Sequence, residues 1–426
     1  MAALIDPSRF TPCFSHRRGT LYCEGVSLEA VASRFGTPAY VYSRASITAA
    51  YRCLDLAVAS LPHTICYSVK ANSNLSILRL FARLGSSFDI VSGGELARLL
   101  RIGVPGRRIV FSGVGKVRDE LRDALRARIL LFNVESEAEL DLLAGVASGL
   151  RCSAHAAIRV NPDVLAGGHP HISTGHRRHK FGLDWRDARR LYLLHRDSRW
   201  INWRGISAHI GSQILELTPF RLALGRVVAY LRELARAGIT LDVLDFGGGL
   251  GIRYAGERAP SLDAYARAVT PLVRPLGCRL LLEPGRALVG PAGVLLTRVL
   301  YTKRNRGKNF VIVDAAMNDF LRPALYGSVH PITPATPTRA DTRTSAPTRA
   351  DIVGPVCETG DCFLENWPLG PISPGDLLVI WGTGAYGFVL SSNYNSRPRP
   401  PEILVDGSRF RLIRPCESPS SLFRSE

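Results

Sequence analysis

Lys70 ends the apolar run TICYSVK (64–70) and is followed at once by the turn residues ANSN. It is one of only five lysines in a chain that holds 54 Lys and Arg residues. A lysine at the end of a buried strand is partly desolvated, which lowers its pKa and makes the neutral amine available. Such an amine can form a Schiff base with an aldehyde cofactor. The alternative is a lysine whose amine simply extends into solvent. The neighbouring residues must distinguish between these two interpretations.

Three further motifs carry groups that suit a flat cofactor with a phosphate. The glycines of GGGLG (247–251) let backbone N–H groups approach a phosphate, although this motif alone is equally typical of a tight turn. His209, in SAHIGSQ, offers an imidazole that can stack on a ring, or it is a histidine satisfied within the core. Glu283, in EPGR, can keep a pyridine nitrogen protonated and so strengthen the ring as an electron sink.

Eight short apolar runs alternate with amphipathic segments and must position these groups. The runs are TICYSVK (64–70), SSFDIVS (86–92), RIVFSG (108–113), ILLFNV (129–134), HAAIRV (155–160), WRGISAHI (203–210), LDVLDF (241–246) and CRLLLE (278–283). Near-continuous apolar strands that alternate with helices are typical of a parallel sheet covered on both faces. Their number favours an α/β fold with a closed (β/α)8 barrel of the TIM type, which we place at residues 44–286.

The ends of the predicted strands carry the candidate chemistry. Barrel active sites lie at the C-terminal ends of the strands. In chain order these ends hold Lys70, Asp89 with Ser92, Ser112, Asn133, Arg159, His209, Gly247–Gly249, and Glu283 with Arg286. Each apolar strand is thus followed by polar, ionisable or glycine residues, which predicts that one site gathers them.

The remaining segments are predicted to form a second domain. After Arg286 the runs are strand-like without intervening helices, which indicates an antiparallel β domain of residues 287–426 together with 1–43, including AYVYS (39–43). Residues 331–350, with PTRAD repeated, are predicted to be a flexible loop. The long insertion 161–185 suits a lid over the site; its histidines lack the acidic or cysteine partners of a metal site, so we expect no metal.

Composition narrows the class of protein. The 426 residues are 46% hydrophobic and 21% charged, as in an ordinary globular protein. The net charge of +18 comes from dispersed arginines rather than basic blocks, which argues against nucleic acid. Nine cysteines without a CxxC pair indicate reduced thiols. No run of 18 apolar residues or signal peptide is visible, so we expect a cytoplasmic protein without a membrane partner.

Taken together, the Lys70 strand end, HIGSQ, GGGLG and EPGR resemble the barrel-type pyridoxal-phosphate decarboxylases of basic amino acids. MNDFLRPALYG (317–327), CETGD (357–361), GAYG (384–387) and SSNYNSRPRP (391–400) narrow the resemblance to the diaminopimelate decarboxylase family. It extends over nearly the whole chain from LYCEGVSLEAVASRFGTPAYVYS onward. HISTG (171–175) and HKFGL (179–183) resemble the lid of that family.

The resemblance implies a role for each matching residue. Lys70 would bind pyridoxal 5′-phosphate covalently. His209 would stack on its ring, and Glu283 would pair with its ring nitrogen. The other cofactor-binding residues would be Asp89, Arg159 near the phenolic oxygen, and Ser212, Gly248, Gly249 and Tyr386 at the phosphate. The distal end of the substrate would be bound by Arg286, Arg322, Tyr326, Glu358 and Tyr386. Cys357 and Glu358 would reach into the partner's site in a homodimer, and Cys357 or Lys70 would supply a proton.

The proposed substrate-binding set has a physical logic. Meso-2,6-diaminopimelate carries an amino-carboxylate at each end, so decarboxylation of one end to give L-lysine and CO₂ leaves a carboxylate to be bound at the other. Arginine offers permanently charged, bidentate recognition of such a group. Decarboxylases of ornithine, lysine, arginine or carboxynorspermidine remain alternatives, as do an alanine racemase and a non-catalytic protein derived from the same fold.

Overall fold

The computed structural model describes residues 11–164, 180–336, 348–424 and 426. Its contacts divide the chain into two compact units. The barrel unit is made of Tyr51–Ile252 and Ala259–Ala287. The sheet unit is made of Met1–Ala50, Arg253–Arg258 and Leu288–Glu426. Helix α2 (Arg44–Ala57) runs across the first boundary and α10 (Arg286–Val289) across the last.

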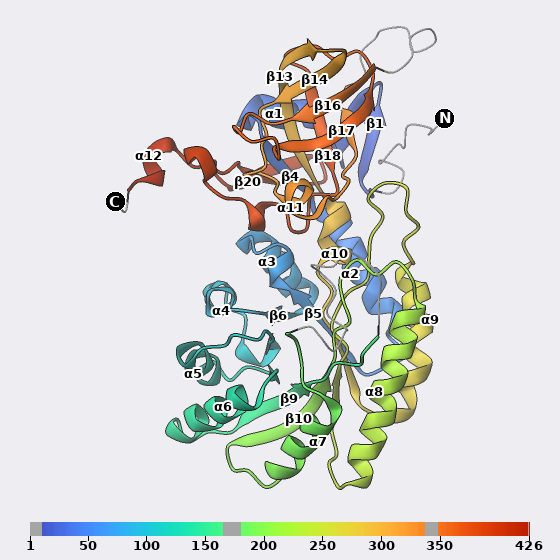
Figure 1. Ribbon diagram of the computed structural model, residues 1–426, viewed down its shortest axis with the longest axis vertical. Helices are drawn as coiled ribbons and strands as arrows, with labels where there is room; N and C mark the ends of the chain where they lie inside the picture. The colour runs from blue at the N-terminus through green and yellow to red at the C-terminus, as the bar shows by residue number, and fades with distance from the viewer. Residues whose placement is uncertain (1–10, 165–179, 337–347, 425) are drawn as a thin grey trace. The chain divides into compact units, whose positions relative to one another are not determined.

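The barrel unit contains a closed ring of eight parallel strands (Figure 1). The strands are β5 (His63–Ser68), β6 (Ser87–Ile90), β7 (Ile109–Phe111), β8 (Leu131–Val134), β9 (Ala154–Arg159), β10 (Ile201–Ser207), β11 (Val243–Asp245) and β12 (Arg279–Leu282). Each overlaps one of the eight apolar runs, and β12 pairs with β5 to close the ring. The predicted (β/α)8 barrel is confirmed.

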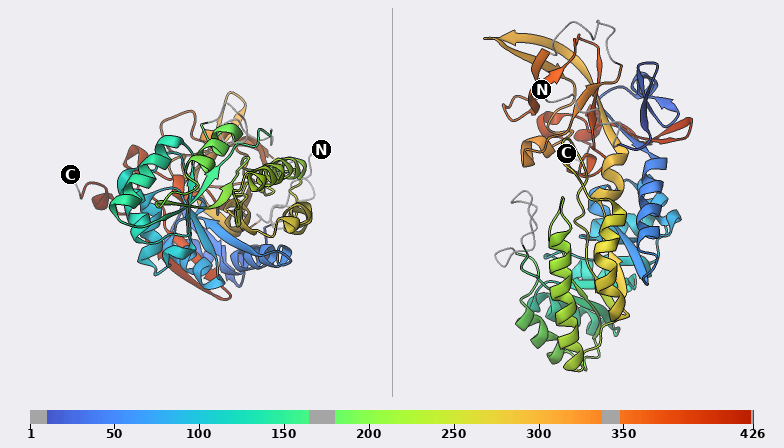
Figure 2. Two further views of the ribbon diagram at one scale, coloured as in Figure 1. Left: turned by 90° about the horizontal axis from the view of Figure 1, so that it is seen from below. Right: turned by 90° about the vertical axis from the view of Figure 1, so that its right-hand side faces the viewer.

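Helices surround these strands, as the view from below in Figure 2 shows. After α2 they are α3 (Leu75–Leu84), α4 (Gly93–Arg101), α5 (Arg118–Arg126), α6 (Glu137–Gly149), α7 (Trp185–Leu194), α8 (Thr218–Arg236) and α9 (Leu262–Val273). Several start at a capping side chain that accepts a backbone N–H of the first turn, as Asn74, Ser92 and Ser136 do for α3, α4 and α6. These caps fix where each strand-to-helix connection ends, and the connections carry the candidate residues.

The sheet unit is built around a nine-stranded sheet with the order β17-β16-β14-β13-β4-β19-β20, in which β18 pairs with β13 and β15. Its strands are β4 (Ala39–Ser43), β13 (Gly293–Asn305), β14 (Lys308–Val313), β15 (Ile332–Pro334), β16 (Thr348–Val353), β17 (Cys362–Leu369), β18 (Leu377–Trp381), β19 (Glu402–Asp406) and β20 (Arg409–Arg414). The segment AYVYS is β4 and belongs to this sheet, as the sequence predicts; it lies between β13 and β19.

This sheet is mixed rather than purely antiparallel, which corrects the sequence prediction. Strand β4 pairs in parallel with β19, and β14 pairs in parallel with β16. A parallel pair needs a long crossover connection, whereas adjacent strands joined by a short turn are antiparallel. The barrel lies between β4 and β19 in the sequence, and α11 (Arg322–Tyr326) and β15 lie between β14 and β16. These long connections allow the parallel pairings.

A small N-terminal sheet and a helix complete this unit. The strands β1 (Phe14–Arg17), β2 (Thr20–Cys23) and β3 (Val26–Ser27) precede α1 (Leu28–Phe35). Ser27 caps α1 by accepting the N–H of Ala30, and Gly36 follows the helix with φ of 79°. The apolar face of α1 packs into a core that includes Trp381 of β18. The short α12 (Pro419–Leu422) lies near the C-terminus.

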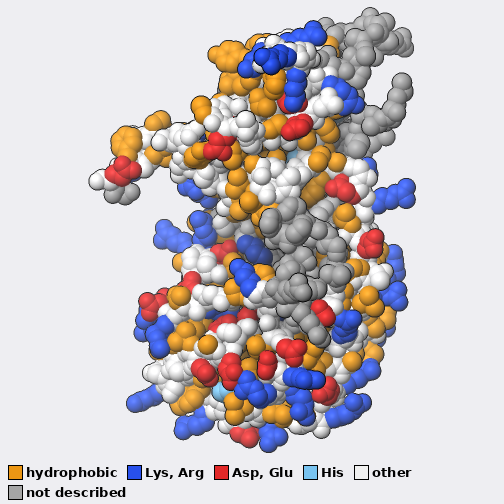
Figure 3. Space-filling model, viewed as in Figure 1, with side chains coloured by type: hydrophobic (Ala, Val, Ile, Leu, Met, Phe, Trp, Pro, Cys, Tyr) orange, Lys and Arg blue, Asp and Glu red, His pale blue; other side chains and the backbone are white. Residues whose placement is uncertain are grey.

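Within 331–350, where the sequence predicts a loop, the structure has β15 at one end and the start of β16 at the other. Residues 337–347 lie outside the described residues. In the described part of the chain, no helix is long and apolar enough to cross a bilayer, and no three His, Cys, Asp or Glu side chains are grouped to hold a metal ion. Basic side chains are interspersed with acidic ones on the face shown in Figure 3.

Two adjacent leucines of α4 provide a test of how this helix packs. Leu99 is fully buried, whereas Leu100 is 43% exposed. Leu99→Ala should lower the free energy of unfolding by about 2–5 kcal/mol because it leaves a cavity, while Leu100→Ala should change it by no more than about 0.5 kcal/mol. Chemical denaturation of both variants measures the difference. Equal losses would mean that the helix packs in another register.

Candidate active site

Lys70 lies two residues after β5, in the short helical turn Val69–Ala71. Its Nζ donates to Oδ2 of Asp89 at 2.9 Å, and Asp89 is fully buried at β6. The Lys70 side chain is 39% exposed, so it is more open to solvent than a lysine on a buried strand end. Ser68 Oγ lies 2.9 Å from the same Asp89 oxygen. These contacts fix the amine at the C-terminal end of the barrel.

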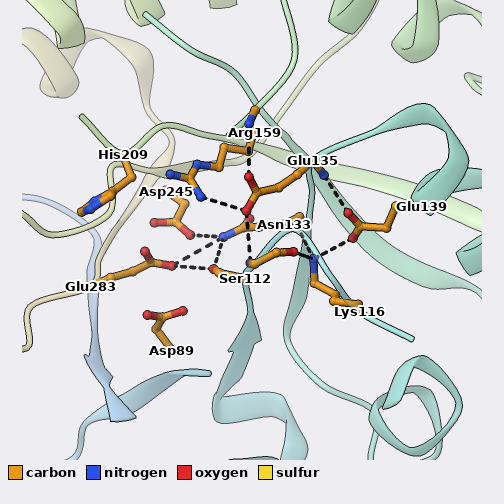
Figure 4. Close-up of polar contacts among 12 residues, drawn as sticks. Asp89, Ser112, Lys116, Asn133, Glu135, Glu139, Arg159, His209, Asp245 and Glu283 are labelled. Carbon is orange, nitrogen blue, oxygen red and sulfur yellow. Dashed lines mark hydrogen bonds and ion pairs between the residues drawn. The ribbon is translucent and has the colours of Figure 1, made fainter. Parts of the chain in front are cut away.

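Two more carboxyls lie close together at the ends of β11 and β12 (Figure 4). Asn133 Nδ2 donates to Asp245 Oδ2 at 2.7 Å and lies 3.5 Å from Glu283 Oε1. Ser112 Oγ donates to Glu283 Oε1 at 3.2 Å. Burial is the main cause that holds the pKa of Glu283 well above its usual range, and the charges of Asp245 and Asp89 raise it further. Burial also raises the pKa of Asp245, so the simultaneous ionisation of both carboxyls is unfavourable unless a cation compensates them.

His209 lies two residues after β10 and is held as a neutral ring. Its Nδ1 accepts the backbone N–H of Gly248 at 3.2 Å, which leaves the ring proton on Nε2. Burial is the main cause that lowers the pKa of His209 well below its usual value, and the charges of Arg159 and Lys70 lower it further. A neutral imidazole fixed at one nitrogen presents a flat face, as stacking requires.

The glycine loop after β11 approaches neighbouring backbone so closely that side chains are excluded. A Cβ on Gly248 would lie 2.3 Å from the carbonyl oxygen of Glu283, and Gly249 has φ of 102° with a Cβ position 2.5 Å from Gly211 O. The N–H of Ile214 donates to Gly249 O at 2.9 Å, which joins this loop to the HIGSQ loop. The two motifs recognised separately in the sequence are therefore one backbone-lined surface.

Ser212 and Arg286 lie beside that surface. Arg286 Nη2 donates to Ser212 Oγ at 3.0 Å, and Arg286 is buried at the start of α10. The family resemblance implies that Ser212 binds a phosphate and that Arg286 binds the distal carboxylate of the substrate. The structure brings these two side chains together.

Arg159, the last residue of β9, has an acidic partner that sequence reasoning missed. Its Nη1 donates to Glu135 Oε1 at 2.8 Å, and both side chains are buried. Asp245 was missed as well. Both acids stand at or just after a predicted strand end, in NVES and LDF, so a search of every strand end for ionisable residues finds them. What each of them contacts is visible only in the structure.

The other predicted residues belong to the sheet unit. Arg322 is buried in α11; its Nε donates to His330 Nε2 at 3.2 Å, and its guanidinium lies over the rings of Tyr254 and Tyr326, both at 5.5 Å. His330 was not predicted. Its other nitrogen, Nδ1, lies 2.8 Å from Trp381 O. Because Nε2 accepts a hydrogen bond from the Nε–H of Arg322, this nitrogen carries no proton and His330 is neutral.

Cys357 and Glu358 are exposed in the segment before β17. The hydroxyl of Tyr394 donates to Glu358 Oε1. Tyr386 follows β18 with φ of 55°, a backbone conformation that a residue with a side chain rarely adopts. Of the predicted lid, residues 165–179 lie outside the described residues. Phe181–Leu183 are described and lie against Arg159.

The barrel residues fit a cationic, phosphorylated ring. Asp89, Asp245 and Glu283 place three buried carboxyls near one another, and their charges disfavour each other unless a cation compensates them. Oδ1 of Asp89 has no hydrogen-bond partner among the described residues. A protonated pyridine supplies such a cation, and the glycine loops supply backbone around a phosphate. Pyridoxal 5′-phosphate matches this combination of groups.

Comparison with known proteins agrees with this geometry. The family model of the pyridoxal-dependent decarboxylase pyridoxal-binding domain matches residues 44–290. Diaminopimelate decarboxylase of Pseudomonas aeruginosa is 48% identical over 97% of this chain and 98% of its own, and that of Neisseria meningitidis serogroup A is 49% identical over 94% and 97%. The structure of diaminopimelate decarboxylase from Helicobacter pylori complexed with L-lysine superposes with a TM-score of 0.89, at 41% identity over 93% of this chain and 98% of the other. Because the likeness extends over both units, the chain belongs to the diaminopimelate decarboxylase family of the pyridoxal-dependent decarboxylases.

Proposed function

We propose that this protein decarboxylates meso-2,6-diaminopimelate to L-lysine and CO₂ with pyridoxal 5′-phosphate as its cofactor. The observation that carries the proposal is Lys70, whose amine donates to Asp89, one of three buried carboxyls at the C-terminal end of the barrel. The relatives of this chain are diaminopimelate decarboxylases. The Helicobacter pylori relative binds L-lysine, which is the product of this reaction. The alternative amino-acid substrates are tested below.

The cofactor, when bound, supplies an electron sink that accepts the electron pair left by the departing CO₂. Lys70 is proposed to hold its aldehyde, and Asp89 to orient the amine through the 2.9 Å contact. Glu283 would pair with the ring nitrogen; a positive ring favours its carboxylate form, which burial and Asp245 otherwise disfavour. The carboxylates of Asp89 and Glu283 would thus stabilise positive charge on the cofactor ring and on the amine that holds it.

The remaining barrel residues are proposed to place the ring and its phosphate. His209 would stack on the ring as a neutral imidazole, since Gly248 fixes its orientation. Gly248, Gly249 and Ser212 would surround the phosphate, with Arg286 beside Ser212 adding positive charge. Tyr386 of the sheet unit is proposed to act at both phosphate and substrate, and Arg159 near the phenolic oxygen.

The distal end of the substrate requires groups that bind an amino-carboxylate. Arg322 and Tyr326 are proposed to bind the carboxylate together with Arg286, and Glu358 to bind the amino group. Arg322 is well suited, because neutral His330 and two tyrosine rings orient its guanidinium. The family resemblance underlies these assignments.

We also propose that two copies of the chain form a homodimer and share their sites, and that the protein is cytoplasmic. Cys357 and Glu358 are exposed on one segment, which makes them accessible to a second copy. Cys357 is one candidate for the acid that protonates the substrate carbon after CO₂ leaves, and Lys70 is the other.

The substrate is tested by CO₂ release from the purified, cofactor-loaded protein. We expect release from meso-diaminopimelate, with L-lysine as product, and none from ornithine, lysine or arginine, because only diaminopimelate retains a second amino-carboxylate end after losing CO₂. Release from one of the other amino acids alone would overturn the substrate. Racemisation without CO₂ release would overturn the reaction.

Lys70→Ala should remove the visible absorbance of covalently held cofactor and lower turnover by about 10⁴-fold or more, because the amine that would hold the aldehyde is lost. Absorbance spectra and CO₂ release measure the two effects. Lys303→Ala, at an exposed lysine of β13, is the matched control and should behave like wild type. Normal turnover in Lys70→Ala would contradict the central assignment.

Arg322→Leu should raise KM for meso-diaminopimelate and lower kcat/KM by about 100-fold, because a charged hydrogen-bonded contact to the distal carboxylate is lost. Cofactor absorbance should be unchanged. Arg411→Leu, at an exposed arginine of β20, controls for the loss of one positive charge. An unchanged KM in Arg322→Leu would show that another residue binds this carboxylate.

A further inference from the structure

Glu135 lies immediately after β8 and connects the ends of several strands. Its Oε1 accepts Arg159 Nη1 at 2.8 Å and the N–H of Gly113 at 3.1 Å. Its Oε2 accepts the N–H of Gly182 at 3.1 Å. One buried carboxylate therefore joins Gly113, two residues after β7, the end of β9, and Gly182 near the end of the 161–185 insertion.

The backbone of Glu135 is held in turn by a second buried ion pair. Its N–H donates to Glu139 Oε2 at 3.0 Å, and Glu139 Oε1 accepts Lys116 Nζ at 2.6 Å. Lys116 also donates to Gly113 O at 2.8 Å and Asn133 O at 2.7 Å. Figure 4 shows this line of contacts running from Lys116 through Glu139 and Glu135 to Arg159.

Phe181 contacts the other side of the same arginine. The Arg159 guanidinium lies 4.8 Å from the centroid of the Phe181 ring. The N–H of Leu183 donates to Arg159 O at 2.8 Å, so the backbone of this segment is tied to β9 as well. The guanidinium is thus oriented by a carboxylate that accepts its Nη1 and by the aromatic ring over which it lies.

Stability alone does not account for this arrangement. A buried ion pair contributes little net stability, because desolvation offsets most of the attraction, and apolar residues of similar volume often pack as stably. What the pair does provide is a defined place for a positive charge. The charge of Arg159 acts on the site, since it helps to lower the pKa of His209.

We propose that Glu135 is a positioning residue which, together with Phe181, fixes the Arg159 guanidinium toward the phenolic oxygen of the cofactor. The proposal rests on the role given to Arg159 under the proposed function. Arg159 is the group that would touch the cofactor, and Glu135 and Phe181 act through it.

A double-mutant cycle on cofactor binding tests this proposal. The cofactor-free forms of wild type, Glu135→Gln, Arg159→Met and the double variant are titrated with pyridoxal 5′-phosphate, and Kd is read from absorbance. Glu135→Gln should raise Kd about tenfold, because it releases the Arg159 guanidinium from its position, and Arg159→Met at least as much, because it removes the cation. The double variant should bind no more weakly than Arg159→Met alone.

The absorbance of the bound cofactor gives a second readout that a merely structural role would not move. A nearby cation favours the ionised phenolic oxygen, so its misplacement in Glu135→Gln should move the pH midpoint of the absorbance change upward. Arg159→Met should move it at least as far, and the double variant no further. Thermal unfolding of each variant separates this effect from a general loss of structure.

Two further variants complete the design. Glu137→Gln removes the exposed ion pair of Glu137 with Arg190, two residues from Glu135, and should leave Kd and the midpoint unchanged. Should Glu135→Gln not fold, Phe181→Leu replaces it in the cycle, since it leaves the buried ion pair intact. It should raise Kd severalfold in wild type and not at all in Arg159→Met.

Wild-type Kd and midpoint in Glu135→Gln, or full additivity with Arg159→Met in both cycles, would overturn the proposal. A lower unfolding temperature with unchanged cofactor properties would do the same, since it would indicate a structural role alone. Cofactor binding is measured without any amino acid. A failure to decarboxylate diaminopimelate would therefore count against the proposed function and leave this test intact.

Discussion

The mutual repulsion of three buried carboxyls is the constraint on which the site depends. Asp89, Asp245 and Glu283 stand at the ends of β6, β11 and β12, where water is largely excluded. Desolvation and like charge raise the pKa of Glu283 and Asp245, so the cluster needs protons, donors or a cation. Lys70, Ser112 and Asn133 meet part of that need. A positively charged pyridine ring would meet the rest, which links the fold to a pyridine cofactor.

The basic side chains of the barrel site likewise depend on neighbouring groups for their charge state or their position. His209 is kept neutral by burial and by the neighbouring charges of Arg159 and Lys70, and its Nδ1 is occupied by the loop N–H of Gly248. The permanent charge of Arg159 is compensated by Glu135, whose Oε1 accepts its Nη1. The buried arginine therefore has a carboxylate partner that fixes its position, and the flat histidine carries no charge.

The barrel was predictable because parallel strands covered on both faces must be apolar along their whole length. The same reasoning placed Lys70, Asp89 and Glu283 at one end, since a parallel ring brings all carboxyl ends together. Pairings between distant segments were not predictable. The parallel pairing of β4 with β19, and the contact of Arg286 with Ser212, depend on backbone geometry that no local pattern encodes.

The line of contacts from Lys116 to Arg159 shows why a chain retains buried charges that contribute little to stability. Four ionisable side chains are buried together, and their oxygens and nitrogens are satisfied by one another and by backbone groups after β7 and β8. Apolar substitutes could fill the same volume, but none could hold a guanidinium in one orientation. A flexible arginine has many rotamers, and each fixed contact removes some of them before a ligand arrives. Pre-organisation of the charge, rather than stability of the barrel, is what this network accomplishes.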